Sequence, residues 1–250
     1  MSETPAYFAA ETSTFQFAWQ GRSLLGIEGD RSDAPVIFSI GRDGQADRTE
    51  LALANARYIS VIGLAGAENG AVAAIGTALS EDGRAVSFLA LISPDRQRRV
   101  VVRLQLYLPK AVAAAPNGVT WTAGWVWDGE TVSQDNLIER FDSSGKLLGL
   151  IPVSTHGRWS SRDEDAAENS VLRSSRDRVG WLTNANQYIE FDLNGHELGR
   201  YPPPPGPPPQ AFESSMALSA SNDVLVGTKD GHKMKLWLLD RQSRSWAPVS

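Results

Sequence analysis

The densest group of potentially reactive side chains lies in the polar segment 154–168. It contains His156, which titrates near neutral pH, and Arg158 and Arg162, which could bind a carboxylate with two parallel hydrogen bonds. Trp159 offers an aromatic surface, and several acidic residues follow. We interpret the segment as a candidate site for an anionic ligand or a sugar, although the same composition is typical of a solvated loop.

A second candidate group stands upstream, where Trp127, Asp128 and Glu130 lie close together. Glycoside hydrolysis uses a pair of carboxyl groups at a fixed separation, and Asp128 and Glu130 could supply one. The surrounding residues do not distinguish these acids from ordinary turn residues, so the sequence assigns no catalytic residue. Both groups are therefore predicted as ligand-binding rather than catalytic.

Trp121, Trp125 and Trp127 alternate along one segment, which places their side chains on one face of a strand. Such a row could stack on sugars, but we favour a role in the core between neighbouring sheets. The other familiar catalytic patterns are missing: the sequence has no Gly-x-Ser-x-Gly elbow, no His-Glu-x-x-His and no phosphate-binding glycine loop. No cofactor and no metal are predicted; Ca²⁺ held by dispersed carboxylates is the open alternative, because such sites leave no linear motif.

A short phrase, repeated about every fifty residues, shows which elements must position these groups. Each copy is an apolar run, a Ser or Asp, a polar turn and a second apolar run. The turn residues are Ser39, Ser93, Asp142, Asp192 and Asp240, which are 54, 49, 50 and 48 residues apart. A period in this range marks a repeat architecture, in which each unit buries its apolar face only against its neighbours.

Each repeat is expected to contain four antiparallel strands. Apolar or alternating segments flank every turn, and Asp-x-x-Gly supplies hairpin chemistry. Each repeat also has a glycine inside an upstream apolar run, a sign of a bulge or of close approach by another chain segment. Gly26, Gly180 and Gly227 precede their turn residues by 13, 12 and 13 residues, and Gly76 and Gly124 are candidate equivalents at 17 and 18 residues. The sequence therefore predicts an all-β fold, a β-propeller of five blades with four antiparallel strands each.

The hairpin phrase Phe-Asp-x-x-Gly-x-x-Leu, at 141–148 and 191–198, resembles that of NHL-type and related six-bladed propellers. The resemblance implies a propeller fold but no single activity, since propellers include hydrolases, lyases, lectin-like binders and docking platforms. This chain shows five repeats instead of six. We expect an N-terminal extension at 1–13 and a single propeller domain at 14–250. Its approximate blades are 14–54, 55–108, 109–153, 170–203 and 212–250.

Composition narrows the possible partners. The formal charge of −5 and a pI near 5.3 disfavour nucleic acid, which attracts clustered Lys and Arg. No apolar run is long enough for a membrane span, and the first residues do not form a signal peptide. The absence of cysteine fits a cytoplasmic location, although export stays open. Self-association through an open blade edge is a further possibility.

From these observations we expect a non-catalytic propeller scaffold that binds a protein or a small ligand through the loops around 127–136 and 154–168. The alternative is a propeller hydrolase, glycosidase-like or lactonase-like, with carboxylates or a Ca-type metal at the channel mouth. The two differ in one feature. A hydrolase needs acids from different repeats that converge on the channel.

Overall fold

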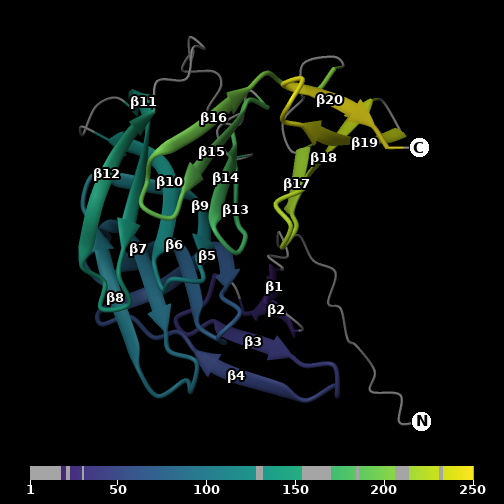
Figure 1. Ribbon diagram of the computed structural model, residues 1–250. Coiled ribbons are helices and arrows are strands. Elements are labelled where there is room, and N and C mark those ends of the chain that lie inside the picture. The colour runs from purple at the N-terminus through teal and green to yellow at the C-terminus, as the bar shows by residue number, and fades with distance from the viewer. Residues whose placement is uncertain are drawn as a thin grey trace.

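The protein forms five four-stranded antiparallel sheets arranged around an axis (Figure 1). The computed structural model describes residues 18–20, 23–29, 31–127, 132–153, 170–183, 186–205, 214–230 and 233–249. In each sheet the four strands follow one another in chain order, so each sheet is a meander. This confirms the prediction of an all-β propeller with five blades of four antiparallel strands.

The first two blades are built from residues 18–104. Blade 1 contains β1 (Ala18–Gln20), β2 (Ser23–Glu28), β3 (Val36–Ile40) and β4 (Ala46–Glu50). Blade 2 contains β5 (Ala56–Gly66), β6 (Val72–Ser80), β7 (Ala85–Ile92) and β8 (Arg99–Leu104).

The other three blades follow in the same order. Blade 3 contains β9 (Tyr107–Ala114), β10 (Thr120–Trp127), β11 (Val132–Phe141) and β12 (Leu147–Val153). Blade 4 contains β13 (Val171–Ser174), β14 (Arg178–Leu182), β15 (Tyr188–Asp192) and β16 (Glu197–Tyr201). Blade 5 contains β17 (Ser214–Leu218), β18 (Val224–Asp230), β19 (Lys233–Asp240) and β20 (Ser245–Pro248).

The repeated phrase forms the hairpin between the third and fourth strands of each blade. In blade 1 the turn begins at Gly41, so the prediction of Ser39 as the turn residue was wrong, because Ser39 lies inside β3. In blade 3 a carboxylate oxygen of Asp142 accepts hydrogen bonds from the backbone N–H of Ser144 at 2.8 Å and of Lys146 at 3.0 Å. Gly145 takes a positive φ of 84°, which a residue with a side chain rarely adopts. Asp192 organises the equivalent turn of blade 4 in the same way. These local bonds explain why the turn residues recur in the sequence.

The repeated glycines lie in the second strand of every blade, where a neighbouring group covers them. Gly26 and Gly76 pair directly with Phe38 and Phe88 on the third strands. A Cβ at Gly76 would lie 2.0 Å from the Ser60 carbonyl oxygen and 2.9 Å from the Phe88 ring. The glycine therefore lets a neighbouring strand and an aromatic ring approach the sheet closely.

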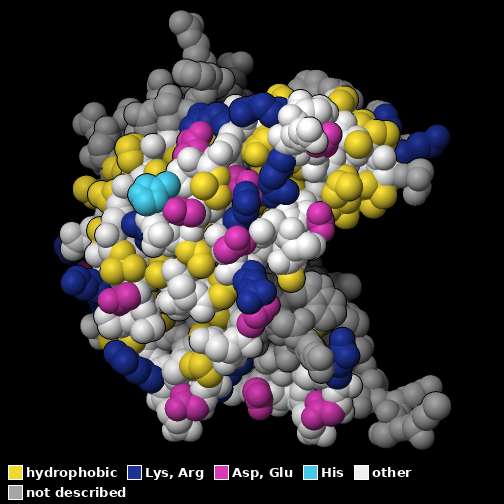
Figure 2. Space-filling model, in the orientation of Figure 1, with side chains coloured by type: hydrophobic (Ala, Val, Ile, Leu, Met, Phe, Trp, Pro, Cys, Tyr) yellow, Lys and Arg dark blue, Asp and Glu magenta, His cyan; other side chains and the backbone are white. Residues whose placement is uncertain are grey.

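Each blade buries its apolar face against the next blade. Four clusters of buried side chains fill the spaces between blades 1 and 2, 2 and 3, 3 and 4, and 4 and 5. No such cluster joins blade 5 to blade 1 within the described residues. On that side of blade 5 Met234, Leu236 and Leu238 are 58%, 42% and 41% exposed. Figure 2 shows hydrophobic side chains near β19, at the edge of a hollow on the right of the view.

The described part of the chain contains no helix that could cross a membrane.

Among the tryptophans of the alternating row, Trp121 is fully buried in the core between blades 3 and 4. Trp181 lies in the same core. Trp125 is partly buried, and the Lys110 ammonium lies 5.1 Å from the centre of its ring. For Trp121, the core interpretation of the row is confirmed.

We expect Gly76→Ala to lower the free energy of unfolding by about 3 kcal/mol, because the new methyl group would meet a backbone carbonyl that cannot move alone. Gly227→Ala is the matched control. Its Cβ would meet only side-chain ends, Ser215 Oγ at 2.7 Å and Met234 Cε at 3.2 Å, which can rotate away. The control should cost less than about 1 kcal/mol in urea unfolding. Equal losses in the two variants would show that close approach at Gly76 is not a packing constraint.

The turn aspartates should make the fold acid-sensitive. Hydrogen bonds from Ser144 and Lys146 lower the pKa of Asp142 below its ordinary value. A carboxyl whose pKa is lowered by folding stabilises the protein above its unfolded pKa of about 3.9 and loses that contribution as the pH falls through the folded pKa. Thermal unfolding between pH 6 and pH 2 should therefore show a weaker acid-induced fall for Asp142→Asn than for the wild type. Asp33→Asn, an exposed change between β2 and β3, should leave the wild-type slope, and a slope unaltered by Asp142→Asn would contradict this role.

Candidate functional site

A cavity of about 310 Å³ lies on the axis of the propeller. The first strands of the blades are the innermost, since β5, β9, β13 and β17 contact one another in sequence around the axis. The cavity is lined by three residues from each of these strands: 64–66, 112–114, 172–174 and 216–218. Its volume is at the lower end of the range of small-molecule sites, roughly 300–1,000 Å³.

Arg173 is the one charged residue among those that line the cavity. One of its guanidinium nitrogens donates a hydrogen bond to the Leu172 carbonyl at 2.8 Å. The structure shows no carboxylate paired with Arg173 among the described residues. Nearby atoms of the channel wall lower the pKa of Arg173 by desolvation, although the residue is exposed to solvent. Because arginine does not lose its proton in proteins, Arg173 gives the channel a fixed positive charge.

The rest of the described channel wall is apolar or hydroxylic. Ser174 donates its hydroxyl to the Ala114 carbonyl at 2.7 Å and so ties β13 to β9. No Asp or Glu lines the cavity. Within the described residues there is also no group of three His, Cys, Asp or Glu side chains that could hold a metal ion. Catalytic acids at this channel would have to come from the connections between strands.

All seven side chains predicted from the sequence lie outside the described part of the structure. Trp127 ends β10, and its side chain is not among the described ones. The other predicted residues are Asp128, Glu130, His156, Arg158, Trp159 and Arg162. The predicted segments share one end of blade 3, because β10 and β12 are both antiparallel to β11. β9 begins at that end of blade 3. The cavity lies at the opposite end, where β5, β9 and β17 finish.

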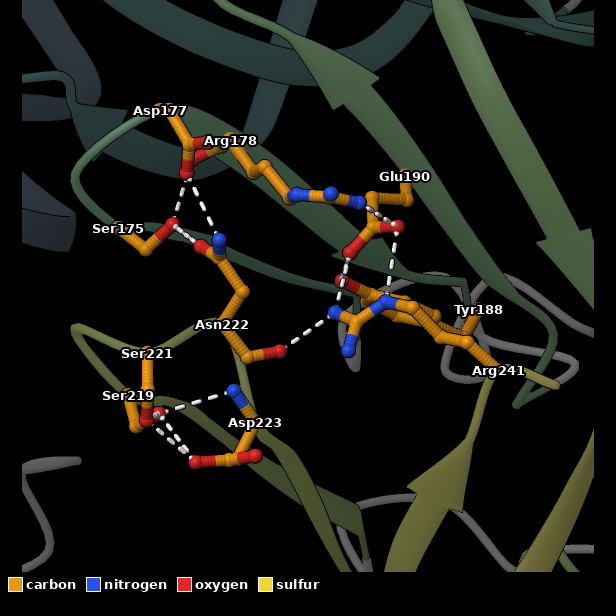
Figure 3. Close-up of polar contacts among 10 residues, drawn as sticks. All are labelled: Ser175, Asp177, Arg178, Tyr188, Glu190, Ser219, Ser221, Asn222, Asp223 and Arg241. Carbon is orange, nitrogen blue, oxygen red and sulfur yellow. Dashed lines mark hydrogen bonds and ion pairs between the residues drawn. The ribbon is translucent and has the colours of Figure 1, made fainter.

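The most elaborate group of buried charges is centred on Glu190, between blades 4 and 5 (Figure 3). Glu190 is 1% exposed. Its carboxylate accepts hydrogen bonds from Arg178 at 2.7 Å, from Arg241 at 2.5 and 3.2 Å, and from the Tyr188 hydroxyl at 3.2 Å. Burial and the neighbouring carboxylate raise the pKa of Tyr188 far above its ordinary value, while Glu190 raises that of Arg241.

This network joins two blades and does not open to the channel. Arg178 and Glu190 belong to blade 4, whereas Arg241 follows β19 of blade 5 and also donates to the Asn222 carbonyl. Asn222 in turn donates to Asp177 at 2.8 Å, so the turns of the two blades are also linked (Figure 3). With its oxygens occupied by donors and shielded from solvent, Glu190 is a structural clamp rather than a catalytic acid.

Glu139 is another titratable residue that no sequence motif predicted. It lies on β11, where burial raises its pKa to about 7. Tyr107 lies near it and donates its hydroxyl to the Leu137 carbonyl at 3.0 Å. Because β11 is the third strand of its blade, Glu139 is set away from the channel wall.

Sequence reasoning missed Arg173 and the Glu190 network. Arg173 does leave a trace, since it interrupts the apolar first strand of blade 4. Glu190 leaves less, because its partners Arg178 and Arg241 are 12 and 51 residues away.

The fold has clear counterparts among solved structures. A protein from Bacteroides fragilis assigned as a 6-phosphogluconolactonase aligns with a TM-score of 0.51 at 12% identity, over 94% of this chain and 68% of its own. A gluconolactonase from Xanthomonas campestris aligns with a TM-score of 0.50 at 17% identity, over 89% of this chain and 84% of its own. The GH43_1 enzyme from Xanthomonas citri, complexed with xylose, gives 0.49 at 13% identity over 94% and 89%. At these identities the likeness shows the fold alone.

Comparisons by sequence add nothing to this. No protein-family model matches the chain, and no curated protein matches it. The NHL-type group named from the hairpin phrase is therefore not confirmed, whereas the coarser assignment to propellers is.

The comparisons correct the functional prediction. The sequence favoured a non-catalytic scaffold because it contains no recognisable nucleophile, base or metal set. The structures that align with TM-scores of 0.50 and 0.51 are instead named as lactonases, so a propeller without a recognisable linear motif cannot be taken for a non-catalytic scaffold. The prediction was wrong because it treated a missing linear motif as a missing site, and propellers assemble sites from separate blades.

Replacement of Glu190 by Gln should destabilise the protein by about 2–3 kcal/mol, because Arg178 and Arg241, which are only partly buried, would lose their buried counter-charge. The matched control is Glu197→Gln. Glu197 pairs with Arg200 at 3.0 Å on the surface, where an ion pair contributes at most about 1 kcal/mol. Unfolding in urea would measure both. If Glu190→Gln lowered the free energy of unfolding no more than Glu197→Gln, the Glu190 network would not stabilise the contact between blades 4 and 5.

Proposed function

We propose that this protein is a hydrolase that acts on a small sugar-derived substrate, a lactone or a glycoside, at its central channel. The fold that it shares with a gluconolactonase and with a 6-phosphogluconolactonase supports the reaction class. Because a shared fold does not carry an activity with it, the site must support the proposal separately.

The observation that carries the proposal is the cavity on the axis, with its apolar wall and one arginine. Its volume suits a molecule of monosaccharide size. Arg173 would attract a substrate that bears a carboxylate or phosphate group and could bind it with two parallel hydrogen bonds. We therefore favour an anionic sugar derivative over a neutral one.

No acid lines the described cavity, so the acids for the reaction are proposed to come from connections between strands at that end of the channel. Hydrolysis needs one carboxyl group to protonate the leaving oxygen and one carboxylate to activate water or attack the substrate. The opposite mouth of the channel is proposed to be a second ligand-binding region, because the predicted segments connect to the end of blade 3 that lies away from the cavity. Its proposed residues are Trp127, Asp128, Glu130, His156, Arg158, Trp159 and Arg162.

Three further predictions from the sequence stay proposals. They are the single domain at 14–250, the kinship with NHL-type propellers and self-association through an open blade edge.

The purified protein should hydrolyse at least one member of a panel containing gluconolactone, 6-phosphogluconolactone and aryl xylosides. Asp128→Asn and Glu130→Gln should leave kcat near the wild-type value, because their segment connects to the end of blade 3 that lies away from the cavity. Arg173→Gln should mainly raise KM for the anionic substrate, because the arginine binds the substrate without taking part in proton transfer.

Asp33→Asn, an exposed change between β2 and β3, is the matched control and should keep the wild-type KM and kcat. An unchanged KM in Arg173→Gln, or no hydrolysis of any substrate by the wild type, would overturn the proposal.

A further inference from the structure

A groove of about 790 Å³ lies away from the channel, between blades 1 and 2. It is bordered by β5–β8 and by the connection that follows β4. Its origin is a difference in strand length. Strands β2–β4 have five or six residues, whereas β5 has eleven and β6 nine. The small blade 1 therefore leaves part of the face of blade 2 uncovered (Figure 1).

The floor of the groove is apolar. Ala56, Ala78, Val86, Phe88 and Val101 contribute to it. Val101 is 40% exposed, although it lies opposite the buried Ala90 and faces the same side of the sheet. An apolar ligand could therefore gain from covering Val101, at about 25 cal/mol per Å² of apolar surface removed from water.

Arginines border this floor. Arg99 and Arg103 lie two residues on either side of Val101 and share its face of β8, because side chains alternate along a strand. Arg84 reaches the groove from the turn between β6 and β7.

The three arginines differ in whether their side chains have hydrogen-bond or ion-pair partners. Arg84 forms an ion pair with Asp82 at 3.3 Å, and Arg99 donates to the Glu50 carbonyl. For the Arg103 side chain the structure shows no hydrogen bond and no ion pair with any described residue. Arg103 is thus a cation beside an exposed apolar strip with its donors available to a ligand.

Two acidic residues lower the net positive charge of the groove lining. Glu81 and Asp82 border it together with the three arginines, so the lining carries a net charge of about +1 at neutral pH. A polyanion would be repelled by the two acids, whereas a single negative charge near Arg103 would be favoured. The four-residue interval from Arg99 to Arg103 covers about 13 Å of strand at 3.3 Å per residue, which suits an extended chain of medium length.

We propose that this groove binds an amphiphilic monoanion, a medium-chain carboxylate. Its acyl chain lies along Val101, and its carboxylate accepts hydrogen bonds from Arg103. The site is separate from the channel and does not depend on the hydrolase proposal.

Decanoate, below its micellar concentration, is the probe, and isothermal titration calorimetry measures its binding. The wild type should bind one equivalent, and Arg103→Gln should bind at least about tenfold more weakly, the loss expected for one charge-assisted hydrogen bond. Arg176→Gln, an exposed change in the turn after β13, is the matched control and should bind as the wild type does. Decanol should bind the wild type at least about tenfold more weakly than decanoate, because it lacks the charge.

Further variants separate this site from the channel. Arg173→Gln should leave decanoate affinity unchanged, whereas Val101→Ser should weaken binding of both decanoate and decanol. Unaltered affinity in Arg103→Gln, or no binding by the wild type, would overturn the proposal. So would loss of decanoate binding in Arg173→Gln, since that result would place the ligand in the channel.

Discussion

The structure depends on one constraint, namely that no blade can bury its own apolar face. A four-stranded sheet has two faces and no third layer, so the aliphatic and aromatic side chains of each blade are hidden only by the next blade. Four cores of this kind stack the five blades around the axis. The same constraint explains the exposed Met234, Leu236 and Leu238, which lie on a blade face that no described core covers.

In this stack of blades, a charged group that is buried has partners of opposite charge, whereas one without such partners stays in contact with solvent. Between blades 4 and 5 the carboxylate of Glu190 is buried, and donors from Arg178, Arg241 and Tyr188 offset the loss of water. Arg173 and Arg103 have no such counter-charge, but each remains in contact with solvent in a cavity or groove. A compensated buried charge fixes the relation between blades, whereas an uncompensated and accessible one is available to a ligand.

Differences among the blades give the molecule its two concave regions. The axial cavity exists because the inner strands of the blades meet with small side chains such as Ala65, Ala113 and Ala217. The outer groove exists because the strands of blade 1 are shorter than those of blade 2. The repeat thus provides the frame, and departures from the repeat provide the places where ligands can bind.

The sequence alone determined the fold class, the number of blades, the hairpin turns around Asp142 and Asp192 and the glycines of the second strands. These features follow from short-range chemistry, such as a carboxylate that caps nearby N–H groups or a glycine that admits an aromatic ring. Only the tertiary structure decided that Glu190 meets Arg241 and that Arg173 faces the axis. It also showed that Val101 and Arg103 border a groove. Those relations join strands tens of residues apart, and they depend on how blades of unequal length stack, which no local pattern records.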